Sequence, residues 1–109
     1  MDWKTLTSLQ DWENALEASH SAPIVVFKHS TRCRVSRMAL KFTERQWDLP
    51  ANVDAYFLDL LANRKVSDAI AEQMNVTHQS PQLLCIREAK CTYNASHEHI
   101  DPLKVKPYL

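Results

Sequence analysis

A short apolar segment, Ile24-Val25-Val26-Phe27, constrains the fold more than any other part of this chain. It is rich in β-branched residues and begins directly after Pro23. A run with these boundaries is typical of a strand buried on both faces of a sheet. A hydroxyl-rich turn follows, and after it a pattern with helical spacing begins. The segment therefore predicts a central strand that leads directly into a helix.

Helical and extended patterns alternate along the rest of the chain. We expect helices over residues 8–19, from 33 to a point before 50, over 63–75, and a short one from 101, and strands over 24–27, 53–60, 82–86 and 91–93. A strand, helix, strand run of this length implies a right-handed crossover between parallel strands, and the last two strands form an antiparallel hairpin. This order predicts an α/β, thioredoxin-like fold with a central four-stranded mixed sheet flanked by helices.

Local signals place the ends and faces of these helices. Thr7 and Gln10 form a capping-box pattern ahead of the first helix. In the second helix, the residues spaced for the core face are apolar, namely Val35, Met38, Ala39 and Phe42. In the last helix, Asp101 is the expected N-cap and Pro102 the expected first residue.

The chain contains no glycine, so other residues must occupy any backbone position with positive φ. Asparagine tolerates this conformation better than most residues. We expect Asn63, Asn75 and Asn94 to fill such positions. The hairpin turn falls on Glu88-Ala89.

Composition limits the class of protein. A length of 109 residues fits one domain, residues 1–109, and thirteen basic residues balance thirteen acidic ones, which argues against a nucleic-acid or membrane-surface binder. No segment is apolar enough to span a membrane, and the N-terminus does not resemble a signal peptide. Three cysteines without regular spacing do not form a disulfide framework. We therefore expect a cytoplasmic protein with reduced thiols.

Cys33 is the candidate reactive residue. It lies where the second helix begins, and unpaired backbone N–H groups at a helix start favour a thiolate. Arg32 and Arg34 flank it, within a stretch from residue 28 to 41 that has basic residues but no acidic ones. Ser36 stands where a Cys-x-x-Cys motif would have its second cysteine, so this thiol can attack a disulfide but cannot close one within the motif.

Other side chains have more than one interpretation. Ser36 is either a hydrogen-bond partner of the Cys33 sulfur or a surface residue, and the sequence leaves both open. The first interpretation of Arg37 and Lys41 is a solvated face of the helix, and the second is a patch that binds an anionic ligand. Cys85 is expected to pack in the core, on the opposite face of the sheet from Cys91, so a disulfide between them is disfavoured. His29 and His78 are more often structural residues than proton donors.

Two separated motifs support a closer comparison. The segment Phe27-Lys28-His29-Ser30-Thr31-Arg32-Cys33, followed by Ser36-Arg37-Met38-Ala39, and the segment His78-Gln79-Ser80-Pro81-Gln82 resemble the monothiol bacilliredoxin-like proteins of the bacillithiol system, the YtxJ-like family. The resemblance implies a thioredoxin fold, with Cys33 as the single active-site cysteine and Pro81 as a cis-proline beside it. One departure is Arg34, because the family usually has proline there.

The resemblance also implies an activity. Cys33 would take bacillithiol, or a similar low-molecular-weight thiol, from mixed disulfides on client proteins, and an outside thiol would then release it. We expect Cys33, Ser36 and Pro81 to be catalytic, and Arg32, Arg34, Arg37 and the backbone of Ser80 to bind substrate. Bacillithiol is expected as a co-substrate, with no bound cofactor or metal.

Two alternatives from other classes stay open. One is an iron–sulfur carrier like the monothiol glutaredoxins, in which Cys33 and an external thiol would hold a cluster between two subunits. The other is a redox-silent thioredoxin-fold module that only binds a partner. A zinc site lacks paired ligands such as Cys-x2-Cys, and a chain without glycine cannot form a glycine-rich phosphate loop.

Overall fold

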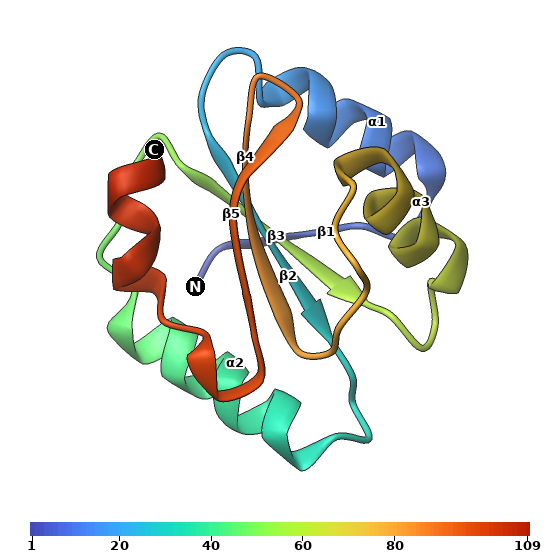
Figure 1. Cartoon of the computed structure of the whole chain (residues 1–109), viewed down its shortest axis with the longest axis vertical. Helices are drawn as coiled ribbons and strands as arrows, with labels where there is room; N and C mark the ends of the chain where they lie inside the picture. The colour runs from blue at the N-terminus through green and yellow to red at the C-terminus, as the bar shows by residue number, and fades with distance from the viewer.

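A five-stranded mixed sheet runs through the centre of the protein in the computed structural model, which describes all 109 residues (Figure 1). The elements are β1 (Trp3–Thr5), α1 (Leu9–Ala18), β2 (Ile24–His29), α2 (Arg34–Gln46), β3 (Asp54–Asp59), α3 (Arg64–Met74), β4 (Gln82–Arg87), β5 (Lys90–Ser96) and two 3₁₀ helices, η1 (His97–His99) and η2 (Pro102–Tyr108). The strand order is β1-β3-β2-β4-β5. Strand β2 is parallel to β3 and antiparallel to β4.

The sheet has one strand more than the four predicted. The additional strand, β1, pairs in parallel with β3 at the edge of the sheet. It is only three residues long, which is too short to show the alternation that identifies a strand in sequence. The other strands and the mixed sheet agree with the prediction.

Helices cover both faces of the sheet. Helices α1 and α3 pack on one face, and α2 and η2 pack on the other (Figure 1). Every residue of β2 is buried, and its side chains alternate between the two resulting cores. Ile24 and Val26 join the core under α1 and α3, while Val25 and Phe27 join the core under α2. The predicted central strand is therefore confirmed.

The predicted core face of α2 is wrong for three of its four residues, and only Ala39 packs against the core. Val35, Met38 and Phe42 are 46%, 62% and 39% exposed. The fully buried side chains of α2 are instead Ser36 and Thr43, seven residues and about two helical turns apart. Since both carry a hydroxyl group, the apolar periodicity of the sequence pointed to a neighbouring face.

Most predicted helix ends are correct within a residue or two. Helix α1 is capped by Ser8, whose side chain accepts a hydrogen bond from the Asp11 N–H at 3.0 Å, rather than by Thr7. Asn75 ends α3 in the left-handed conformation, with φ of 55°. Asn63 and Asn94 do not adopt positive φ, and His97 does so instead.

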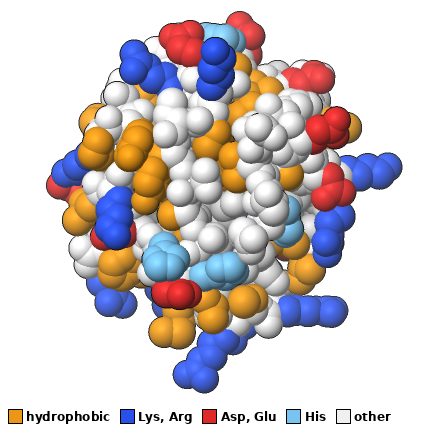
Figure 2. Space-filling model, viewed as in Figure 1, with side chains coloured by type: hydrophobic (Ala, Val, Ile, Leu, Met, Phe, Trp, Pro, Cys, Tyr) orange, Lys and Arg blue, Asp and Glu red, His pale blue; other side chains and the backbone are white.

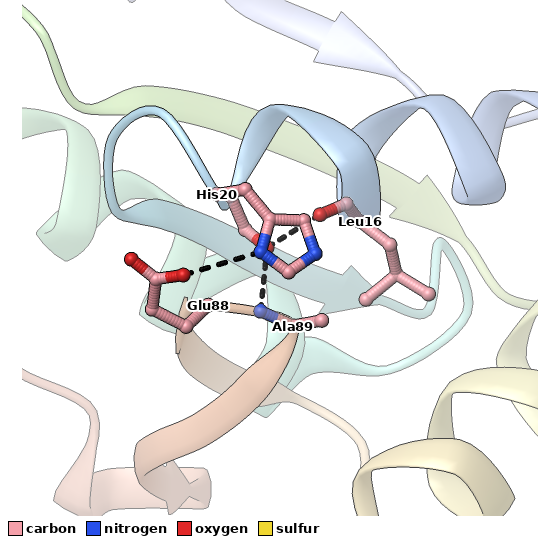
Figure 3. Close-up of polar contacts among 5 residues, drawn as sticks. Leu16, His20, Glu88 and Ala89 are labelled. Carbon is pink, nitrogen blue, oxygen red and sulfur yellow. Dashed lines mark hydrogen bonds and ion pairs between the residues drawn. The ribbon is translucent and has the colours of Figure 1, made fainter.

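The hairpin between β4 and β5 turns at Glu88-Ala89, as predicted. Both residues have positive φ, 52° and 57°, which a two-residue type I′ turn requires and which normally favours glycine or asparagine. Ser19, just after α1, holds the turn: its carbonyl accepts from the Glu88 N–H at 3.0 Å and its Oγ accepts from the Ala89 N–H at 2.8 Å. His20 Nδ1 lies 3.2 Å from Glu88 Oε2 in the same contact (Figure 3).

All three cysteines are free thiols. Cys85 belongs to the core under α2, whereas Cys91 packs against the core under α1 and α3, so their predicted placement on opposite faces is confirmed. The hairpin has a register shift between Cys85 and Ile86, so Cys85 pairs with Tyr93 and Ile86 pairs with Cys91. Burial raises the pKa of both thiols, which keeps them protonated at neutral pH. No helix has the length and apolar content that crossing a membrane requires.

Candidate active site

The sheet topology brings the Cys33 loop and the Pro81 loop to the same end of the sheet. Because β2 and β4 are antiparallel neighbours, the end of β2 lies beside the start of β4, and Lys28 pairs with Gln82 there. Residues 30–33 leave β2 at this edge, and Pro81 immediately precedes β4. The Ser80–Pro81 peptide bond is cis.

Cys33 is the N-cap residue of α2. Its backbone is extended, with φ of −102° and ψ of 120°, and its carbonyl accepts the Arg37 N–H at 3.1 Å. The Cys33 side chain makes no capping hydrogen bond and is half-buried. The sulfur is thus attached at the positive end of the helix dipole, where a negative charge is stabilised. The sequence placed Cys33 at this helix start.

A buried hydrogen-bond network shapes the loop that carries Cys33. The Ser36 Oγ accepts from the Ser30 N–H at 3.0 Å and lies 2.8 Å from His29 Nδ1. Ser36 is fully buried, so its interpretation as a surface residue is wrong, and no hydrogen bond joins it to Cys33. Ser36 therefore acts on the cysteine through the shape of the loop.

His29 belongs to the end of β2 rather than to a loop. Burial lowers its pKa, and the positive charge of Arg37 lowers it further, against an opposing effect of Asp59. A neutral imidazole at pH 7 suits the short bond to the Ser36 hydroxyl, because neutral histidine has one nitrogen that accepts.

The three arginines near Cys33 are exposed, and only one of them forms a hydrogen bond within the protein. Arg37 Nη1 donates to the Thr31 carbonyl at 3.2 Å, which ties the first turn of α2 to the loop before Cys33. Arg32 and Arg34 form no hydrogen bond or ion pair within the protein. Their guanidinium groups are free to bind an anionic ligand beside Cys33.

A buried lysine, which sequence reasoning did not select, supports the loop before Pro81. Lys28 is fully buried on β2, and its Nζ donates to the Ser67 carbonyl at 3.2 Å and lies 3.4 Å from His78 Nδ1. Burial lowers the pKa of Lys28 to about 8, against the attraction of Asp68. The pKa of His78 is also lowered, by burial first and by Lys28 next. The signal in the sequence was a lysine directly after the strand predicted over residues 24–27 to be buried on both faces.

Only some of the backbone polar groups around Pro81 take part in loop and cap hydrogen bonds. The Pro81 carbonyl accepts the His97 N–H at 3.0 Å, whereas the Ser80 N–H and C=O take part in none of the loop and cap hydrogen bonds. Ser80 Oγ is buried without a partner, and so is Gln82 Oε1. The Ser80 main chain therefore has polar groups without a partner among these hydrogen bonds, and the role in substrate binding that the family resemblance implies for it stays a prediction.

The motif provides one free, half-buried thiol at Cys33 and no second cysteine. The other two cysteines are held in the sheet with raised pKa values. The protein also has no cluster of three or more His, Cys, Asp or Glu side chains that could hold a metal ion. Such a site can exchange thiols at Cys33 and depends on a thiol from outside to be reset.

Comparison with known proteins identifies the family. A family model described as monothiol bacilliredoxin BrxC matches residues 4–105. A solved structure described as a proposed oxidoreductase with a thioredoxin fold is 29% identical, with a TM-score of 0.77 over 95% of this chain and 90% of the other. The thioredoxins of Trypanosoma brucei brucei (13% identity, TM-score 0.76, 98% and 87% covered) and Fasciola hepatica (19%, 0.71, 95% and 93%) share the fold.

Proposed function

Since this chain belongs to the monothiol bacilliredoxin family, we propose that it removes bacillithiol from protein mixed disulfides, with Cys33 as the nucleophile. The observation that supports this most directly is the position of Cys33. It caps the start of α2 with a free, half-buried side chain, and Ser36 replaces the second cysteine that would form an internal disulfide.

The reaction is two successive thiol exchanges. The Cys33 thiolate attacks the bacillithiol sulfur of the client mixed disulfide, a new S–S bond forms, and the client cysteine leaves as a thiolate that takes a proton from water. A second thiolate, from free bacillithiol, then attacks the bacillithiol sulfur on Cys33. This step yields bacillithiol disulfide and restores the Cys33 thiolate.

Each neighbouring residue has a distinct part in this scheme. The start of α2 stabilises negative charge on Cys33 as attacking and leaving group. Arg32 and Arg34 bind the carboxylates of bacillithiol, while Arg37 positions the loop through the Thr31 carbonyl. The unoccupied backbone of Ser80, next to Pro81, binds the client main chain. The proposed compartment is the cytoplasm, where thiols are kept reduced.

The test uses a model client that carries a bacillithiol mixed disulfide. We expect release of the client thiol with the native protein, a mass increment of one bacillithiol on Cys33, and loss of both in Cys33→Ser. Cys91→Ser is the matched control and should keep the activity. Client release by Cys33→Ser, or an adduct found on Cys91, would contradict the proposal. Cys33-dependent visible absorption after anaerobic iron–sulfur reconstitution, without client release, would favour the carrier alternative.

A further inference from the structure

Helix α2 exposes an apolar stripe that begins two residues after Cys33. The stripe consists of Val35, Met38 and Phe42, whose exposed fractions are 46%, 62% and 39%. Figure 2 shows hydrophobic side chains gathered beside two histidines and an acidic side chain on this face. Since apolar side chains grouped on a surface often mark a binding site, we treat the stripe as a candidate binding surface.

A groove of about 440 Å³ lies between the stripe and the segment from His97 to Asp101, with Lys104 at its border. This volume lies within the usual range for ligand-binding clefts. The lining is apolar on the α2 side and polar except for Ile100 on the other, so an occupant needs both kinds of group.

The two walls of the groove are connected to the segments that carry Cys33 and Pro81. At one end Val35 follows Cys33 by two residues. On the opposite wall, the His97 N–H is hydrogen-bonded to the Pro81 carbonyl at 3.0 Å. A chain bound between Cys33 and Pro81 can therefore continue into the groove.

The charges along the groove differ between its two walls. With a rotation of about 100° per residue, Arg34, Lys41 and Arg45 lie together on the solvent side of the stripe. We call these three the basic ridge, and all of them are exposed. Glu98 and Asp101 line the other wall. That wall also carries Lys104, so two acidic groups there face one basic group, and an acidic group on the occupant is favoured on the α2 side.

We propose that this groove binds the client polypeptide next to its bacillithiolated cysteine, and prefers a segment with apolar side chains and an acidic residue. Apolar side chains of the client cover the stripe, and its acidic side chain faces the basic ridge. A second copy of this chain is a poorer occupant, because twofold pairing along α2 would bring two basic ridges together. The inference rests on the proposed function and specifies which clients it serves.

The experiment compares three bacillithiol mixed disulfides. Two are peptides, one with Leu and Glu on both sides of the cysteine and one with Ser and Lys instead, and the third is the mixed disulfide with 2-mercaptoethanol. The second-order rate constant for thiol release is measured for the native protein, Met38→Ser and Leu9→Ser. Leu9 is the matched control, because it is 49% exposed on α1, across the sheet from α2.

We expect the Leu/Glu peptide to react about tenfold faster than the Ser/Lys peptide, as for a difference of ~1.4 kcal/mol. The ratio compared between variants is the rate constant for the Leu/Glu peptide divided by that for the small disulfide. Met38→Ser should lower this ratio about fivefold, whereas Leu9→Ser should leave it unchanged. Equal rates for the two peptides, or an unchanged ratio in Met38→Ser, would overturn the inference. A dimer in ultracentrifugation that Met38→Ser abolishes would assign the groove to a second copy. Failure of the native protein on the small disulfide would count against the proposed function itself.

Discussion

Replacement of Ala89 by glycine should stabilise the protein. Ala89 occupies the second central position of the hairpin turn with φ of 57°. The left-handed conformation costs a residue with a Cβ about 1–2 kcal/mol, a cost that glycine avoids. Glycine also gives the unfolded chain more freedom, which removes about 0.4–1 kcal/mol of that gain. The N–H of residue 89 can still donate to Ser19 Oγ, so the anchor is kept.

The net gain is therefore roughly 0.5–1 kcal/mol. For a domain of 109 residues, an unfolding entropy of about 2.1 cal/mol/K per residue converts this gain into a Tm about 2–4 °C higher. The measurement is thermal unfolding by circular dichroism, with urea unfolding at 25 °C as an independent check.

Ala71→Gly is the matched control. Residue 71 lies inside α3, where the same substitution should cost about 1 kcal/mol. Opposite signs for the two variants would support a strained turn held by Ser19. A Tm for Ala89→Gly equal to or below that of the native protein would refute the reasoning.

Three further predictions concern the site. Ser36→Ala should reduce the free energy of unfolding by about 1–3 kcal/mol in urea titrations, because it leaves buried groups without their partner. Burial lowers the pKa of Lys28 from 10.5 to about 8 in the folded protein. Between these two pH values the Lys28 side chain holds its proton in the unfolded chain and loses it in the folded protein. As pH rises from about 8 to 10.5, the native protein should therefore gain stability relative to Lys28→Met, and a constant difference would contradict this. In iodoacetamide labelling at pH 7 followed by mass spectrometry, Cys33 should react before Cys85 and Cys91, whose pKa values are raised by burial.

Features that depend on local sequence could be predicted. The central strand follows from a short apolar run after Pro23, and the turn at Glu88-Ala89 follows from the two strands around it. Cys33 at the start of α2 follows from the change of periodicity at that point. In each case neighbouring residues carry the information.

Features that depend on contacts between different elements of the fold could not be predicted. The burial of Ser36 is explained by His29, on the preceding strand, and their contact exists only after α2 has folded back over the sheet. Lys28 likewise meets Ser67 and His78, which are 39 and 50 residues away in sequence. Polar groups buried in such networks lower the hydrophobicity of the face that packs inward, which is why the sequence indicated the wrong side of α2.

The β4–β5 turn lies at the opposite end of the sheet from Cys33, because it adjoins the start of β2 and Cys33 follows its end (Figure 1). Lys90, exposed beside that turn, offers a point for coupling the protein to a resin with its reactive end facing the solution. With Lys90 as the attachment point, Cys33 would lie away from the support and stay accessible to bacillithiol mixed disulfides passed over the column.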